Sequence, residues 1–288
     1  ELNADVPEGA VMLHGVRRVF EISPTWNLVS REFPLGHLPM ESAQDRTLLS
    51  PWRSPGRPRI GVVGWLEGAE AVSARMLATH LNLHGYRTAV ASPSECACDG
   101  KRFLAGGEEV DIVYRLCHLP DILSRPQECR ALLTASRTGA VPLVNPLAAE
   151  IFSHKYLLAL LDQPPWSGSV APGDRALIGN ALPWGAVVAE GPARTPEGET
   201  RDLPAWISSR REDLVLKEAH GQGGGDVMLG WTVDRAAWDA FLSRLLAEGG
   251  VVQKRLAAPR DVYPRIAPGA PVEEFYEDTV AYVFDGIP

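Results

Sequence analysis

The chain has 288 residues, of which 45% are apolar and 22% are charged, and its formal net charge is −8. This composition predicts a folded protein of about two domains, and the acidic balance argues against a partner that is nucleic acid or a membrane surface. No apolar run reaches the length of a membrane span, and no signal-peptide pattern opens the chain. The four cysteines are too few for a disulfide scaffold, which favours a reduced, cytoplasmic setting.

The first part of the chain leads into a linker. Residues 50–59 (SPWRSPGRPR) are rich in proline, glycine and arginine, which is typical of a connection between domains. The chain begins at Glu1 without a methionine and stops within 279–286 (TVAYVFDG), an apolar run typical of a strand. We therefore expect the natural protein to extend beyond both ends.

Strands and a helix alternate in the next part. Apolar runs predict short strands and apolar residues at helical spacing predict a helix that ends at Gly85, a typical C-cap glycine. This order predicts a doubly wound parallel sheet with ligand sites at the carboxyl ends of its strands. Arg115, at the end of a strand, is then placed to meet an acidic substrate; the alternative is a surface arginine that closes the strand. The expected strands are 59–64, 88–91 and 111–116, and the expected helix is 69–85.

The character of the chain changes after this region. Residues 141–146 (VPLVNP) predict a strand that runs into a turn, and 148–161 predict an amphipathic helix that carries Lys155. Residues 163–204 are dense in proline, glycine and tryptophan, so we expect an irregular connection there.

A strand, a lysine, a glycine-rich loop and a second strand follow one another in residues 214–230 (LVLKEAHGQGGGDVMLG). Glycine lets backbone N–H groups approach anionic oxygens, and Lys217 adds a point charge, so this hairpin is suited to covering phosphates. The alternative is a long hairpin turn whose glycines only adopt positive φ. The glycines match neither P-loop nor G-x-G-x-x-G spacing. A helix at 234–248 and a strand at 250–256 are expected to follow.

The segments HKYLLALL, LVLKEAHGQGGGDVMLG and VVQKRL follow one another in the second half of the chain, and ELNADVPEGA opens it. Together they resemble the ATP-grasp family, and the opening segment is similar to the E-x-N-x-D-x-P stretch of its circularly permuted, glutathionylspermidine synthetase-like members. The resemblance implies a mixed α/β chain with a circularly permuted ATP-grasp fold, in which ATP lies between two α+β lobes. It also implies a metal-binding segment at 1–55, a Rossmann-like pre-ATP-grasp substrate domain at 56–145 and nucleotide-binding lobes at 146–288.

The resemblance and the charge of ATP suggest roles for particular residues. ATP carries about four negative charges, so its site needs several cations. Lys217 would contact the α- and β-phosphates and Lys155 would be the second phosphate lysine; the alternative for Lys155 is a solvated helix lysine. Gln253 would face the adenine edge, unless it is simply exposed on an alternating strand. Backbone N–H groups of the loop would cover the β- and γ-phosphates, from Gly223, Gly224 and Gly225.

The start of the chain suggests a magnesium site. Glu1 and Asn3 would share one face of a strand, and their oxygens suit a hard cation. Asp5 is a further candidate, although next to Pro7 it is also suited to shaping a turn. We find no secure third ligand, and one upstream of Glu1 is left open. The alternative for the whole segment is a frayed acidic terminus.

These features predict an ATP-dependent ligase that joins small-molecule carboxylate and amine substrates through an acyl phosphate, with Mg²⁺, releasing ADP and phosphate. The first alternative is a nucleotide-binding or scaffold protein that has lost catalysis. A Rossmann-type nucleotide-sugar enzyme is the second, but it leaves the glycine hairpin unexplained. Neither the identity of the substrates nor homo-oligomer formation is decided by the sequence.

Overall fold

The computed structural model describes residues 3–6, 9–34, 40–161, 166–220, 226–264, 271–277 and 281–284. Its contacts divide the chain into two compact units. We call Asn3–Ile151 with Ala281–Pro288 the N-terminal unit, and Phe152–Val280 the C-terminal unit. Within the described residues, no helix is both long enough and apolar enough to cross a membrane.

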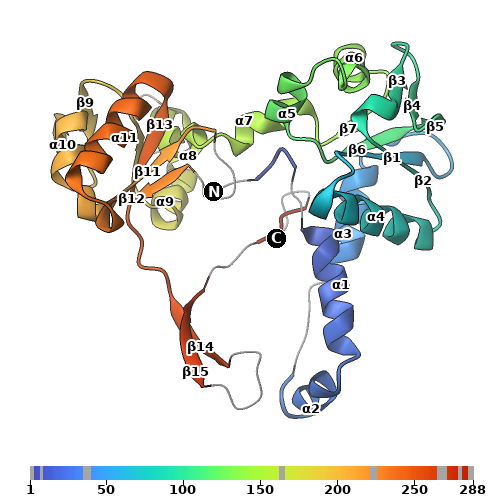
Figure 1. The fold of residues 1–288 in the computed structure, drawn as a ribbon, viewed down its shortest axis with the longest axis horizontal. Helices are drawn as coiled ribbons and strands as arrows, with labels where there is room; N and C mark the ends of the chain where they lie inside the picture. Colours follow the sequence, from blue (N-terminus) through green and yellow to red (C-terminus); the bar gives the residue numbers. More distant parts are fainter. Residues whose placement is uncertain are drawn as a thin grey trace. The chain divides into compact units, whose positions relative to one another are not determined.

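A four-stranded parallel sheet forms the centre of the N-terminal unit, with strand order β2-β1-β6-β7 (Figure 1). In its register, Ile60 of β1 pairs with Thr88 of β2 on one side and with Ile112 of β6 on the other. The predicted strands and the predicted parallel pairing are therefore confirmed. The strands are β1 (Arg59–Val63), β2 (Arg87–Ala91), β6 (Ile112–Arg115) and β7 (Leu143–Val144).

Both faces of this parallel sheet are buried, because successive side chains of a strand point to opposite faces. Val62 packs on one face with Leu77 of α4 (Gly68–Leu83). Val63 packs on the other face with Leu132 of α6 (Arg130–Thr138). The helix predicted at 69–85 corresponds to α4, and Gly85 follows it with the positive φ of 83° expected of a C-cap glycine.

The sequence reasoning did not anticipate the helices before the linker. Val11 of α1 and Leu48 of α3 belong to the same core cluster as Leu77 of α4, so these helices are part of the N-terminal unit. Its remaining elements are α1 (Ala10–Glu21), α2 (Pro24–Glu32), α3 (Met40–Leu49), η1 (Pro93–Glu95), the antiparallel strands β3 (Cys96–Cys98), β4 (Phe103–Ala105) and β5 (Glu108–Val110), α5 (Leu119–Ser124), and η2 (Leu147–Ala149).

An antiparallel sheet of order β12-β11-β13-β8 forms the centre of the C-terminal unit (Figure 1). Helix α11 (Arg235–Glu248) covers one face, where its Trp238 packs with Leu216 and Val252. The predicted hairpin strands, the following helix and the following strand are confirmed. The strands are β8 (Gly185–Val187), β11 (Leu214–Glu218), β12 (Val227–Leu229) and β13 (Gly250–Lys254).

Shorter elements complete the C-terminal unit. They are α8 (Tyr156–Leu161), η3 (Trp166–Ser169), α9 (Pro172–Ala181), β9 (Pro192–Arg194), β10 (Thr200–Asp202), α10 (Leu203–Ser209), η4 (Arg211–Asp213), η5 (Gly230–Thr232), and the hairpin of β14 (Arg260–Pro264) and β15 (Val272–Tyr276).

The expected irregular connection at 163–204 is wrong for most of its described residues. This stretch contains α9, β8 and a β9–β10 hairpin, and β8 pairs with β13 in the central sheet. Proline and glycine here lie at the ends of short elements: Pro172 begins α9 and Gly185 begins β8. The composition therefore marked element boundaries.

The strand expected in TVAYVFDG is also wrong for the residues described there. Residues 281–283 lie in no regular element, and Phe284 forms only an isolated bridge. The described part of this segment packs against the start of the chain: a Cβ built on Gly9 would be 2.5 Å from the Tyr282 hydroxyl.

Candidate functional site

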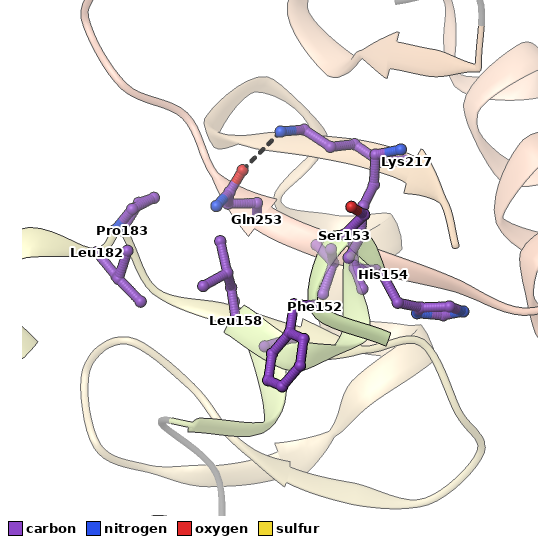
Figure 2. Close-up of a pocket in the computed structure, with 13 residues that line it drawn as sticks. Phe152, Ser153, His154, Leu158, Leu182, Pro183, Lys217 and Gln253 are labelled. Atoms are coloured by element: carbon purple, nitrogen blue, oxygen red, sulfur yellow. Dashed lines mark hydrogen bonds between the residues drawn. The ribbon is translucent and has the colours of Figure 1, made fainter. Parts of the chain in front are cut away.

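A pocket of about 520 Å³, part of which is open to solvent, lies within the C-terminal unit (Figure 2). Lys155, Lys217 and Gln253, three of the side chains predicted to bind a nucleotide, all line it. The other lining residues are Phe152, Ser153, His154, Leu158, Ala159, Leu182, Pro183, Gly185, Val251 and Val252.

The alternation of the central sheet brings Lys217 and Gln253 together. Val215 of β11 pairs with Gln253 of β13, and Lys217 lies two residues further along β11, so both polar side chains share a face. The Lys217 ammonium group donates a hydrogen bond to Gln253 Oε1 at 2.8 Å (Figure 2). Leu216 lies between Val215 and Lys217 in β11, so its side chain points to the opposite face, where it joins the core around Trp238.

The prediction of one helix at 148–161 is wrong, because the structure has two short helices there. Lys155 lies at the break between them and lines the pocket. Helix α7 (Glu150–Ser153) ends before His154, and α8 begins at Tyr156. The backbone N–H of Tyr156 donates to His154 Nδ1 at 3.2 Å, and the backbone N–H of Lys155 donates to the Ala219 carbonyl at 3.4 Å. These two hydrogen bonds take the place of helical i→i−4 bonds. The His154 side chain accepts the N–H of Tyr156 at the start of α8, and the distant Ala219 carbonyl accepts the N–H of Lys155.

The same break connects the pocket to the start of the glycine loop. Ala219 and His220 follow β11, and His220 Nε2 lies 3.1 Å from His154 Nε2. On the far side of the loop, the Asp226 carbonyl accepts a hydrogen bond from the Glu218 N–H at 3.0 Å. Gly223, Gly224 and Gly225 lie outside the described residues, so their predicted role stays a prediction.

The pocket combines cationic and apolar groups. Burial lowers the pKa of His154, and the charges of His220 and Lys155 lower it further, so His154 is neutral at pH 7. The positive charge therefore comes from Lys155 and Lys217. Phe152 and Leu158 add apolar surface (Figure 2). Such a pocket suits a ligand with a flat apolar ring at one end and anionic oxygens at the other.

Several pocket residues were missed by the sequence reasoning. Leu182 and Pro183 lie in the stretch expected to be irregular, where periodicity offered no guide. His154 and Leu158 lie within the quoted segment HKYLLALL, and the polar residues at its start were the available indication that it does more than fill a helix.

The structure buries Arg115, the residue predicted to meet an acidic substrate. It ends β6 as expected, but its side chain is 0% exposed and forms an ion pair with Asp5, whose side chain is 2% exposed. The guanidinium group also donates to the Asn145 carbonyl at 3.1 Å and to the Cys117 carbonyl. Since none of the side chain reaches solvent in this structure, Arg115 is engaged inside the N-terminal unit, and its contact with an acidic substrate stays a prediction.

Asp5 is the counterpart of that buried arginine. Burial raises its pKa, but hydrogen bonds from His118, Arg115 and the Leu119 N–H outweigh this effect and lower the pKa to about 2. The Leu119 N–H donates to Asp5 Oδ2 at 2.9 Å. Asp5 is therefore an ionised carboxylate engaged inside the protein, which removes it as a candidate magnesium ligand.

The predicted magnesium ligands are not brought onto one strand by the described residues. Glu1 lies outside them, and residues 3–6 form no strand, while Asn3 is exposed. Side chains hold this segment instead of a strand ladder: Asn145 Nδ2 donates to the Ala4 carbonyl at 2.6 Å.

No family model and no curated protein matches the chain. Among solved structures, it is similar to a RimK-domain ATP-grasp protein from Sphaerobacter thermophilus, at 19% identity and a TM-score of 0.37, over 71% of this chain and 68% of that one. It is similar to the ATP-grasp ligase PsnB complexed with minimal precursor, at 12% identity and a TM-score of 0.42, over 77% of each chain. It is also similar to D-alanyl-alanine synthetase A from Vibrio cholerae, at 10% identity and a TM-score of 0.43, over 79% of this chain and 77% of that one. Proteins described as ATP-grasp are thus among the structures to which this chain is similar, and this is the family that its sequence segments resemble.

Proposed function

We propose that the chain is an ATP-dependent ligase, built on a circularly permuted ATP-grasp fold, that joins a small-molecule carboxylate to an amine. In this reaction the carboxylate attacks the γ-phosphate of ATP and ADP leaves; the amine then attacks the acyl phosphate and phosphate leaves. The observation that carries the proposal is the convergence of Lys155, Lys217 and Gln253 on one pocket from three separate parts of the chain.

The pocket supports specific roles for these side chains. Adenine would lie against the apolar surface of Phe152 and Leu158, with the Gln253 amide at its polar edge. Lys217 would neutralise the α- and β-phosphates and Lys155 would be the second phosphate cation. Both ammonium groups would stabilise the negative charge that develops on the transferred phosphoryl group, so no nucleophilic side chain is required.

The proposal includes a magnesium ion, for which Glu1 and Asn3 are the proposed ligands. These two residues would hold the ion, and it would supply neutralisation of phosphate charge. It prefers about six oxygen ligands in an octahedral arrangement. Within residues 3–6, the only carboxylate is that of Asp5, and Arg115 occupies it. The described part of this segment therefore does not fit a magnesium site by itself.

A second candidate function is nucleotide binding without ligase chemistry, in a protein that has kept the fold as a scaffold. It is favoured by the burial of Arg115 and Asp5 against each other, since neither is then available to a substrate or a metal. Under either function the natural partners are small molecules, and we place the protein in the cytoplasm.

Thermal unfolding with ATP tests the binding site. A ligand present at 100 times its Kd stabilises a protein by about 2.7 kcal/mol, so saturating ATP should raise the Tm of wild type. Lys217→Met should weaken ATP binding by about 10-fold or more, because a hydrogen bond to a charged group contributes about 1.5–3 kcal/mol. AMP binding should be weakened less, since AMP lacks the β- and γ-phosphates.

Lys254→Met is the matched control for this experiment. Lys254 follows Gln253 on β13, is exposed, and lies outside the described pocket lining. It loses the same charge, so it should bind ATP like wild type. The binding proposal would be refuted if ATP gave no stabilisation, or if Lys217→Met and Lys254→Met bound ATP equally well.

Product analysis separates the ligase from the scaffold. ADP and phosphate release should depend on a pooled set of carboxylates and amines, and hydroxylamine should trap the acyl phosphate as a hydroxamate. If the protein bound ATP but released no ADP with any member of the pools, and no hydroxamate formed, the scaffold function would replace the ligase.

A further inference from the structure

Two histidines and an aspartate meet in the N-terminal unit, whereas the nucleotide pocket is built from the C-terminal unit. His80 lies in the last turn of α4, and His84 is the C-cap residue of that helix. Residues four apart lie on the same face of a helix, so both rings point the same way. They meet Asp45 of α3, whose Oδ1 is 2.9 Å from His80 Nε2 and whose Oδ2 is 2.6 Å from His84 Nδ1.

The two distances from Asp45 to the histidine rings are slightly shorter than the spacing between neighbouring ligands of a metal site. One ligand atom from each of Asp45, His80 and His84 lies within 4.8 Å of the others. In a tetrahedral zinc site with bonds of about 2.0–2.1 Å, neighbouring ligand atoms are roughly 3.3 Å apart. Movements of less than about 1 Å would open the two contacts with Asp45 to that spacing, and His84, with 43% of its side chain exposed, has room to make them.

A third histidine from another helix adjoins the cluster. The ring centroid of His14, in α1, is 5.4 Å from that of His80. Both ring nitrogens of His14 are shielded from solvent, and neither has a hydrogen-bond partner among the residues described. A shielded imidazole nitrogen without a partner is costly, and a metal ion bound to one of the two nitrogens would offset the cost for that nitrogen. Only Asp45, His80 and His84 have ligand atoms that all lie within 4.8 Å of one another, so the His14 ring would have to turn towards them to bind.

The donor set indicates which ion would fit. Imidazole nitrogens with one carboxylate oxygen suit zinc, whereas magnesium and calcium prefer oxygen ligands alone. The simpler account is that Asp45 accepts an N–H hydrogen bond from each of His80 and His84, which would hold α3 to α4. That account leaves the shielded nitrogens of His14 without a role.

We propose that Asp45, His80 and His84, with His14 as the fourth ligand, bind a zinc ion that ties α1, α3 and α4 of the N-terminal unit together. Four protein ligands leave no open position for substrate, so this zinc is structural. The site is independent of the nucleotide pocket, and its success or failure leaves the proposed ligase function unchanged.

Metal titration of the full chain tests the site. After removal of metal with a chelator, the protein should bind one Zn²⁺ per chain by calorimetry, and Zn²⁺ should raise its Tm. Co²⁺, used as a spectroscopic substitute, should give the intense visible absorption of tetrahedral coordination. His84→Ala and Asp45→Asn should each weaken binding by about 10-fold or more and abolish this absorption. Both variants should fold, since His84 is half exposed and asparagine keeps the shape of Asp45.

Glu32→Gln is the control, because Glu32 is an exposed carboxylate at the end of α2, in the same unit, and loses the same charge. It should keep wild-type affinity and the tetrahedral spectrum. Failure of wild type to bind Zn²⁺ stoichiometrically would refute the site, and so would binding that survives both Asp45→Asn and His84→Ala. A Co²⁺ spectrum unchanged in His14→Gln would refute the fourth ligand. An equal loss in Glu32→Gln would show general charge attraction in place of coordination.

Discussion

Replacing Asp5 by asparagine removes one charge of a buried ion pair and keeps the shape of the side chain. In wild type, Asp5 and Arg115 are 2% and 0% exposed, and the Leu119 N–H also donates to the Asp5 carboxylate. In Asp5→Asn, the buried Arg115 guanidinium loses the carboxylate with which it forms its ion pair. We therefore expect the N-terminal unit to lose stability.

The loss of stability in Asp5→Asn should be a few kcal/mol. Removing one partner of a buried ion pair costs about 3–5 kcal/mol. The pKa of Asp5 is lowered from its usual 3.8 to about 2, a preference for the charged form of roughly 2 kcal/mol at 1.36 kcal/mol per pKa unit. Because the asparagine oxygen can still accept one hydrogen bond from Arg115, we expect a cost of about 2–4 kcal/mol at pH 7.

The pH dependence of stability has a definite sign. Asp5 has a lower pKa in the folded than in the unfolded chain, so its contribution is present above the usual carboxyl pKa. It is lost as the pH falls from about 5 towards 2. In Asp5→Asn this part of the acid loss should be missing, and the free energies of wild type and variant should converge near pH 2.

Urea unfolding followed by tryptophan fluorescence, at a series of pH values, measures both effects. Asp121→Asn is the control, because Asp121 is a partly exposed carboxylate in the first turn of α5, within the same unit. It should change the free energy of unfolding by no more than about 0.5 kcal/mol. If Asp5→Asn cost no more than this control at pH 7, or if the two curves stayed parallel down to pH 2, the reasoning would be refuted.

Two further tests by urea unfolding concern the C-terminal unit, one at its glycines and one at the helix cap Asp234. A Cβ on Gly230 would lie 1.9 Å from the Arg211 carbonyl oxygen, so Gly230→Ala should lower the free energy of unfolding by about 1–3 kcal/mol. Gly179 lies in helix α9, and a Cβ there would meet nothing within 4 Å, so Gly179→Ala should raise it by about 0.5–1 kcal/mol. An unchanged stability of Gly230→Ala would contradict the packing. Asp234→Ala should cost about 1 kcal/mol, because the Ala237 N–H loses its 2.8 Å side-chain acceptor at the start of α11; an unchanged free energy would mean that water replaces the cap.

Local patterns in the sequence were sufficient for elements that are continuous in the chain. The apolar run at 59–64 became β1, the 3.6-residue periodicity at 69–85 became α4, and the lysine–glycine segment became the β11–β12 hairpin. These elements are predictable because their hydrophobic spacing and end residues act over a few neighbouring positions. Lys155, Lys217 and Gln253 could be proposed together only through a resemblance to known proteins, since no local rule relates residues so far apart.

Contacts between distant residues decided the rest. Where the helix around Lys155 breaks, the Ala219 carbonyl accepts the Lys155 N–H, and residue 219 lies beyond the reach of any helical pattern. Arg115 ends its strand as predicted, but only the folded chain places Asp5 against it and buries its charge. The strands of the two sheets and the helices α4 and α11 thus follow from patterns among neighbouring residues, with β8 as the exception. Which polar side chains are buried and which face a pocket follows from the folded chain alone, because burial depends on partners that folding brings from elsewhere in the sequence.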